Sequence, residues 1–188
     1  MAGKIVKVMT NTVTSAVSTV SLTGINSDHV YMIAYNNLTP ATDNRSISLR
    51  VTKSGSADTT SNYDYAYKVL NSSSSFGNGS FQNDTEFQYP IGDAIGTGTS
   101  ESANGIIYLY NFNSSSKNSL ITYEVTQLNN TPNARGAQGA GVHTVQSRSD
   151  GVIFFDTAGG NIASGSMTLY KILWGLLNDN TQRIFIHW

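Results

Sequence analysis

Apolar and polar residues alternate with a period of two along much of this chain, the pattern of a strand with one buried face. The pattern is clearest in SISLRVTK (46–53), where Ile47, Leu49 and Val51 share one side. Similar or more apolar segments recur at 5–8, 12–22, 29–38, 62–70, 85–91, 105–112, 119–128, 151–156, 166–174 and 182–188. Turn-forming residues separate these segments. The sequence therefore predicts an all-β chain, an antiparallel β-sandwich of about ten strands with long polar loops.

Uncharged polar side chains dominate the composition. Serine, threonine and asparagine make up about one third of the chain, whereas charged residues make up 12%. Intracellular enzymes usually carry about twice that share of charge. Hydroxyl and amide side chains favour turns and strand faces over helix interiors. The 10 tyrosines and 7 phenylalanines are too many for a disordered chain, so the composition indicates a folded β protein.

The charges are few and balanced, with 11 basic and 12 acidic residues and no basic cluster. Because phosphate contacts need such a cluster, no nucleic-acid partner is expected. No window approaches the roughly 20 apolar residues of a membrane helix, and no signal peptide is recognisable. We therefore expect no membrane partner, and synthesis in a cytoplasm. The absence of cysteine excludes disulfides and thiolate metal sites.

The 188 residues are expected to form a single domain, a β-sandwich over residues 1–188. Residues 1–25 are a candidate N-terminal arm, and residues 174–188 are a candidate C-terminal docking strand. In the second segment, Phe185 and Trp188 are expected to lose solvent on assembly. Three polar segments rich in glycine, serine or asparagine read as long loops: 71–84, 92–105 and 129–150.

The stretch SDGVIFFDTAGG (149–160) allows two interpretations. Its apolar run leads to Asp-Thr-Ala-Gly, similar to the Asp-x-x-Gly of small GTPases, where the aspartate helps to hold Mg²⁺. That interpretation needs an upstream glycine-rich loop ending in Gly-Lys-Ser/Thr, which the chain lacks. The favoured interpretation is a strand and a tight turn. There the side chains of Asp156 and Thr157 bond to local backbone amides, and Gly159 and Gly160 supply positive φ.

No constellation of residues points to catalysis. His29, His143 and His187 lie in separate segments without metal-ligand spacing, so neither a metal nor a cofactor is expected. The glycine-rich GAQGAGVH (136–143) departs from the dinucleotide-binding spacing. The candidate acidic pairs lie in or beside polar loops, at Asp84/Glu86 and Asp93/Glu101. The predicted sets of catalytic, cofactor-binding and metal-binding residues are therefore empty.

Three tyrosines, Tyr63, Tyr65 and Tyr67, share one face of segment 62–70. An aromatic stripe of this kind can bind a sugar or a partner protein, and it can equally belong to the core. The alternate positions are mostly polar, as on a solvent-facing side. Core or subunit contact is therefore favoured over sugar binding, and the three tyrosines join Phe185 and Trp188 as candidate interface residues.

The segment GGNIASGSMTLYKI (159–172) resembles the closing hairpin of a large group of virion proteins from tailed bacteriophages. In that group a small turn precedes Gly-x-Ile-x-Ser-Gly and a strand finishing Leu-Tyr-Gly-Ile. The matching residues are Gly160, Ile162, Ser164, Gly165, Leu169 and Tyr170. Lys171 stands where the group usually has glycine. Segment 105–124 is similar to the group's strand–turn–strand hairpins. The resemblance implies a jelly-roll-like β-sandwich of a capsid or tail, with no catalytic residue to carry over.

These observations lead to one main functional hypothesis and two rivals. The main hypothesis is a non-enzymatic virion structural protein, a capsid decoration (cement) protein that binds the major capsid shell and assembles as a homotrimer. The first rival is a tail-fibre or receptor-binding module that recognises a host surface glycan through loops 71–84 or 92–105. The second rival is a polysaccharide hydrolase that uses Asp93 or Glu101.

Overall fold

The computed structural model describes residues 3–73 and 76–174, and this part of the chain folds into thirteen β-strands. It contains no helix that is long and apolar enough to cross a membrane. The strands are β1 (Lys4–Val13), β2 (Thr19–Thr23), β3 (Val30–Pro40), β4 (Arg45–Lys53), β5 (Ser56–Ala57), β6 (Tyr63–Asn71), β7 (Gly77–Asp84), β8 (Phe87–Ile95), β9 (Ala103–Tyr110), β10 (Ser119–Leu128), β11 (Ala134–His143), β12 (Gly151–Asp156) and β13 (Ile162–Leu173).

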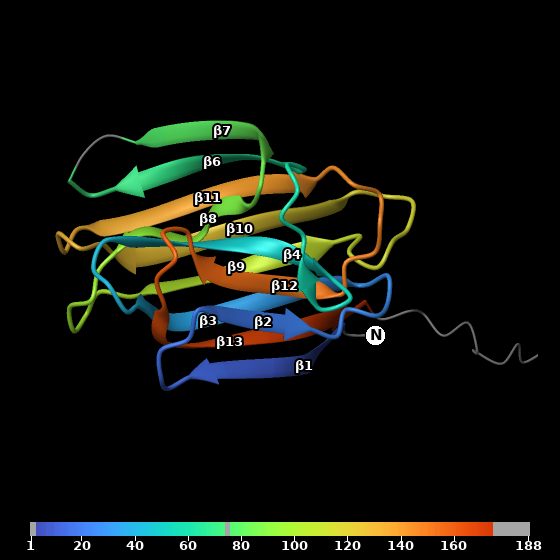
Figure 1. The fold of residues 1–188 in the computed structure, drawn as a ribbon, viewed down its shortest axis with the longest axis horizontal. Coiled ribbons are helices and arrows are strands. Elements are labelled where there is room, and N and C mark those ends of the chain that lie inside the picture. The colour runs from blue at the N-terminus through green and yellow to red at the C-terminus, as the bar shows by residue number, and fades with distance from the viewer. Residues whose placement is uncertain (1–2, 74–75, 175–188) are drawn as a thin grey trace, which may run out of the picture.

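The strands pair antiparallel in two sheets (Figure 1). The large sheet has eight strands in the order β1-β13-β3-β9-β10-β11-β6-β7. The small sheet has the order β2-β12-β4-β5, and β8 pairs with β4 on the edge that β5 also uses. Figure 1 shows β4, β12 and β2 drawn over the strands of the large sheet, with β6 and β7 extending beyond them.

Eight of the strands follow the jelly-roll order. In the large sheet β1-β13-β3-β9 are neighbours, and in the small sheet β2-β12-β4-β8 are neighbours. Along this set the chain changes sheet at every step except from β4 to β8, as in a jelly roll. The remaining strands are insertions, of which β10, β11, β6 and β7 widen the large sheet. The predicted jelly-roll-like β-sandwich is therefore confirmed.

The core lies between the two sheets and is built from alternate residues of their strands. Ile47, Leu49 and Val51 of β4 are fully buried, as their alternation predicted. In β10 every second residue from Ser119 to Gln127 is buried, and the residues between are exposed. Full burial of each large aliphatic side chain stabilises the fold by about 1.5–3 kcal/mol.

Two of the three segments expected as loops contain complete strands. Segment 71–84 includes β7 and segment 129–150 includes β11, whereas 92–105 includes only the ends of β8 and β9. Three of the five glycines in these strands, Gly79, Gly139 and Gly141, lie against aromatic rings of other strands. A Cβ atom on Gly79 would lie 2.7 Å from Cζ of Tyr67, and one on Gly141 would lie 2.6 Å from the Phe87 ring. Glycine therefore makes room for cross-strand rings, which corrects the loop prediction.

The segment expected as a closing hairpin is a connection between layers. β12 pairs with β2 and β4 in the small sheet, whereas β13 pairs with β1 and β3 in the large sheet. The turn after Asp156 therefore carries the chain from one sheet to the other. The expected hairpin at 105–124 is confirmed, because β9 and β10 pair antiparallel.

The two terminal segments differ in what the structure describes. Within residues 1–25, β1 and β2 are edge strands of the large and small sheets. Residues 175–188 lie outside the described residues, so the docking strand and the interface roles of Phe185 and Trp188 stay predictions.

Candidate functional site

Two tyrosines of the predicted stripe belong to the core. Tyr63 and Tyr65 have 0% and 4% of their surface exposed. The Tyr63 hydroxyl donates to the carbonyl oxygen of Asp58 at 2.6 Å, and the Tyr65 hydroxyl donates to Oδ2 of Asp84 at 2.8 Å. Burial raises the pKa of both hydroxyls well above the ordinary value, so both remain neutral donors. Neither tyrosine side chain is exposed enough to contact a partner.

The third tyrosine of the stripe lies in an aromatic cluster at the β6–β7 end of the sandwich. The ring of Tyr67 stacks on Tyr89 with centroids 4.1 Å apart. Phe81 of β7 stacks on Tyr65 at 5.1 Å and keeps 41% of its surface exposed. The cluster therefore closes the core where the large sheet extends past the small one, and its outer members remain accessible.

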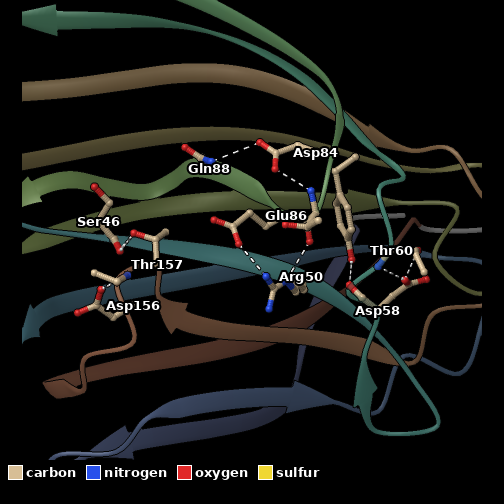
Figure 2. Close-up of polar contacts among 12 residues, drawn as sticks. Ser46, Arg50, Asp58, Thr60, Asp84, Glu86, Gln88, Asp156 and Thr157 are labelled. Carbon is tan, nitrogen blue, oxygen red and sulfur yellow. Dashed lines mark hydrogen bonds and ion pairs between the residues drawn. The ribbon is translucent and has the colours of Figure 1, made fainter.

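The acidic pair Asp84/Glu86 is held by hydrogen bonds and by one cation (Figure 2). Nη2 of Arg50 lies 2.9 Å from Oε2 of Glu86, and Nε of Arg50 donates to the carbonyl oxygen of Thr85 at 2.9 Å. The guanidinium also lies over the ring of Phe155, 4.2 Å from its centroid. Burial raises the pKa of Glu86, and the Arg50 charge opposes that rise. Each contact of Arg50 joins β4 to the segment before β8 or to β12.

The second acidic pair is divided between different partners. Asp93 accepts a hydrogen bond from the Ser46 hydroxyl at 2.6 Å, and Nη2 of Arg135 lies 2.6 Å from its other oxygen. Glu101 instead folds back and accepts from the backbone N–H of Gly98 at 2.8 Å. No hydrogen-bond partner among the described residues joins the two carboxylates.

The two described histidines lie in different places. His143 of β11 is fully buried beside Asp58 and Tyr63. His29 lies just before β3, at one end of the sandwich. The described residues contain no group of three or more histidines and acids placed to hold a metal ion.

The stretch after β12 forms the expected turn. Oδ1 of Asp156 accepts from the backbone N–H of Ala158 at 2.8 Å, and Gly159 has a φ of 77°, whereas Gly160 does not adopt the positive φ that was predicted for it. Thr157 departs from the prediction, because its hydroxyl donates to the carbonyl oxygen of Ser46 across the small sheet, as its backbone N–H also does. Arg45 lies 3.8 Å from the second oxygen of Asp156. The aspartate thus anchors the turn between the layers.

The outer face is defined as the side chains of the large sheet that point away from the small sheet. Antiparallel register aligns one row of this face across all eight strands, namely Thr10, Thr168, Ala34, Ile106, Glu124, Gln138, Lys68 and Asn78. Three apolar residues on this face, Ile106, Leu120 and Leu70, are about 40% exposed. No other described segment covers them.

Three shallow hollows lie along the outer face. One is lined by Leu120 and Val142, a second by Leu70 and Phe76, and a third by Leu70 and Ile106. The sequence analysis missed these residues because it assigned each strand one apolar side. The available signal was in segments 105–112 and 119–128, where apolar residues occupy both sides.

No family model and no curated protein matches this chain. Among solved structures, it is similar to tailspike protein 2 of the Escherichia coli O157:H7 bacteriophage CAB120, with a TM-score of 0.30 and 12% sequence identity. The match covers 92% of this chain and 26% of the tailspike chain, so this chain spans about a quarter of the tailspike's length. A TM-score of that size establishes neither a shared fold nor a shared function.

Proposed function

We propose that this protein is a non-enzymatic structural protein of a tailed-bacteriophage virion, and that it decorates the capsid. The outer face of the large sheet docks on the capsid shell. The observation that carries the proposal is the exposure of apolar side chains on three strands of one continuous sheet face that no other described segment covers. The motif at residues 159–172 and the low charge of the chain support the assignment to a virion.

The outer face is large enough for a stable interface. With strands spaced about 4.8 Å apart and about 30 Å long, eight strands present on the order of 1,000 Å². A standard protein–protein interface needs about 800 Å² from each partner. Contiguous exposed apolar patches of several hundred Å² commonly mark interaction sites, and Leu70 and Ile106 line one hollow of this face together.

Few charges lie on this face, and the two in its central row have opposite signs. In the central row only Glu124 and Lys68 are charged, and the Gln138 amide between them donates to Glu124 at 3.3 Å. A face of this kind gains its binding energy from buried area, and its partner surface is expected to be apolar and hydroxyl-rich. Closed homotrimers are the assembly we propose for the protein on the shell.

The non-enzymatic part of the proposal is supported by the ion pairs and hydrogen bonds that the candidate carboxylates already make. Asp93 is paired with Arg135, Glu86 with Arg50, and Glu101 with a backbone amide. A general acid or base must instead reach a substrate. Release of reducing ends from bacterial polysaccharide by the purified protein, lost in Asp93→Asn or Glu101→Gln, would revive the hydrolase.

A binding experiment tests the docking face. Purified protein is mixed with virions that lack it and sedimented, and the bound amount is measured. We expect Ile106→Glu and Leu70→Glu to reduce binding at least tenfold, because each places a charge in a buried interface. Val17→Glu is the matched control, since Val17 is an exposed apolar residue on the β1–β2 connection. Equal binding by all three variants would overturn the proposed face.

Copy number separates decoration from the tail-fibre alternative. A decoration protein is present in virions at a number comparable with the capsid subunits, whereas a fibre protein follows the few fibres of the tail. Quantitative mass spectrometry of purified virions measures this ratio. The exposed Phe81 at the β6–β7 end is the observation that favours a receptor-binding role, and a low ratio would select that role.

A further inference from the structure

A polar hollow of about 290 Å³ lies at one end of the sandwich, beside the outer face. One wall comes from the β2–β3 connection, with Asp28 and His29. The other comes from the β9–β10 hairpin, with Tyr110, Asn111 and Lys117. Its size is close to the lower limit of pockets that bind small molecules, which is about 300 Å³.

The hairpin wall is held in place by its own contacts. Asn111 adopts a left-handed conformation with a φ of 62°, which starts the turn. The carbonyl oxygen of Asn111 accepts from the N–H of Ser114 at 3.0 Å. Phe112 is 1% exposed and anchors the loop in the core, where its carbonyl oxygen accepts from Ser149. The wall is therefore preformed rather than assembled by a ligand.

The opposite wall is fixed by Tyr31. Its hydroxyl oxygen lies 2.8 Å from the Ser27 hydroxyl and accepts from the N–H of Asn26 at 3.3 Å. The Tyr31 ring is fully buried, so this bond ties the connection to the core. Nδ2 of Asn113 lies 3.4 Å from Oδ1 of Asp28 and links the two walls.

The side chains in the hollow favour a neutral, polyhydroxylated ligand. Asp28 supplies acceptors and Lys117 supplies donors, and their opposite charges disfavour an isolated anion or cation. Among the described residues Lys117 makes no ion pair. Tyr110 adds an aromatic ring, against which the C–H face of a sugar packs. With Val30 the single aliphatic lining residue, an apolar ligand has little to contact.

We infer that this hollow binds one saccharide unit of a neutral glycan. Asp28 and Asn111 contact sugar hydroxyls, Lys117 donates to a hydroxyl or ring oxygen, and Tyr110 packs against the ring. The site lies apart from both loops expected to read a glycan, 71–84 and 92–105. It is independent of the proposed docking on a capsid.

A titration of the ¹⁵N-labelled full chain tests this inference. The probes are glucose, galactose, mannose and N-acetylglucosamine, each added to tens of millimolar, with sodium phosphate as the comparison anion. We expect at least one sugar to shift the amide signals of His29, Asn111 and Lys117 in a saturable way. Phosphate is expected to leave them unchanged.

Two exposed substitutions connect any shift to the hollow. Lys117→Ala and Asp28→Asn are each expected to weaken sugar binding about tenfold, since each removes a charge-assisted hydrogen bond. Lys7→Ala is the matched control, because Lys7 is an exposed lysine on β1. The inference is overturned by no shift with any of the four sugars, by equal binding in both variants, or by phosphate shifting the same signals. Each of these outcomes leaves the virion proposal standing.

Discussion

Nε2 of His143 lies 3.2 Å from Oδ2 of Asp58, and the imidazole has no exposure to solvent. Asp58 already has stronger partners. Nζ of Lys53 lies 2.7 Å from the same oxygen, and Thr60 donates to the other. Burial lowers the pKa of His143, and the Asp58 charge opposes this shift without cancelling it. The imidazole is therefore neutral in the folded chain at neutral pH.

We expect the free energy of unfolding to fall as the pH drops below about 6.5, the ordinary pKa of histidine. A base with a lower pKa in the folded chain takes up its proton more readily after unfolding. The stability that neutral His143 contributes is thus full above this pH and is lost below it. Urea unfolding at about pH 7.5 and about pH 5.5 measures the loss. His143→Gln should reduce it, and His29→Gln should not.

Asp58 contributes to the free energy of unfolding in a different pH range. Burial acts to raise its pKa, but hydrogen bonds from Lys53 and Thr60 hold the pKa below its usual range. The stability that Asp58 contributes is full above about pH 3.9, its pKa in the unfolded chain, and is lost as the pH falls further.

Burial keeps the pKa of the neighbouring Tyr63 far above both of these pH ranges. A loss near pH 6 that persists in His143→Gln would contradict the assignment to His143.

Arg50 and Glu86 are expected to be strongly coupled. Arg50→Met leaves the Glu86 carboxylate, whose side chain is 9% exposed, without its cation. Removing one member of such a pair costs about 3 kcal/mol. Glu86→Gln in the same chain should recover part of that loss, because the neutral amide is cheaper to bury. Chemical denaturation of the two single variants and the double variant gives the coupling energy.

Lys68→Met is the control for Arg50→Met. Lys68 is an exposed cation near an aromatic ring, 5.7 Å from the centroid of Phe76. Its replacement should change the free energy of unfolding by no more than about 0.5 kcal/mol. Additive effects of the Arg50 and Glu86 substitutions would show that the bond at 2.9 Å contributes nothing to stability.

Ala94 occupies a backbone conformation that suits glycine. Its φ is 54°, in the left-handed region, within the irregular strand β8. A Cβ atom there costs about 1 kcal/mol, so Ala94→Gly should stabilise the fold by up to that amount, less the entropy that glycine gains when unfolded. Ala66→Gly, at an exposed position of β6, should destabilise it by about 0.5–1 kcal/mol. Thermal unfolding compares the two, and a destabilised Ala94→Gly would refute the assignment of strain.

The strands that were predicted from the sequence are those whose own residues show a clear apolar pattern. Segment 46–53 alternates without interruption, and the structure buries all three of its apolar residues, along with Ser48 and Thr52 on the other side. The hairpin of β9 and β10 was similarly visible, because a polar turn joins two apolar runs. In both cases the apolar pattern is local, so the sequence contains most of the information needed to locate the strand, although β4 pairs with the distant β12 and β8.

The strands that sequence analysis missed depend on neighbours distant in the chain. β11 reads ARGAQGAGVH, a composition depleted in strands, yet register places Gly139 between Tyr123 of β10 and Tyr67 of β6. The Tyr123 ring lies against Gly139, so a glycine is needed there only once both strands are in place. The outer face was missed for a related reason, because the exposure of a strand's side depends on whether the other sheet packs against it.

Gly139→Val tests this explanation directly. A Cβ atom at Gly139 would meet the hydroxyl of Tyr123 and would lie 2.6 Å from the carbonyl oxygen of Ala66, which the β6–β11 pairing holds in place. Because neither the ring nor the backbone has free space, we expect a loss of about 2–3 kcal/mol, measured by urea unfolding. Ala140→Val is the control, since Ala140 is exposed on the outer face of the same strand and should change stability by less than about 0.5 kcal/mol. If the two valines cost the same, the glycines of β11 are not there to accommodate the rings.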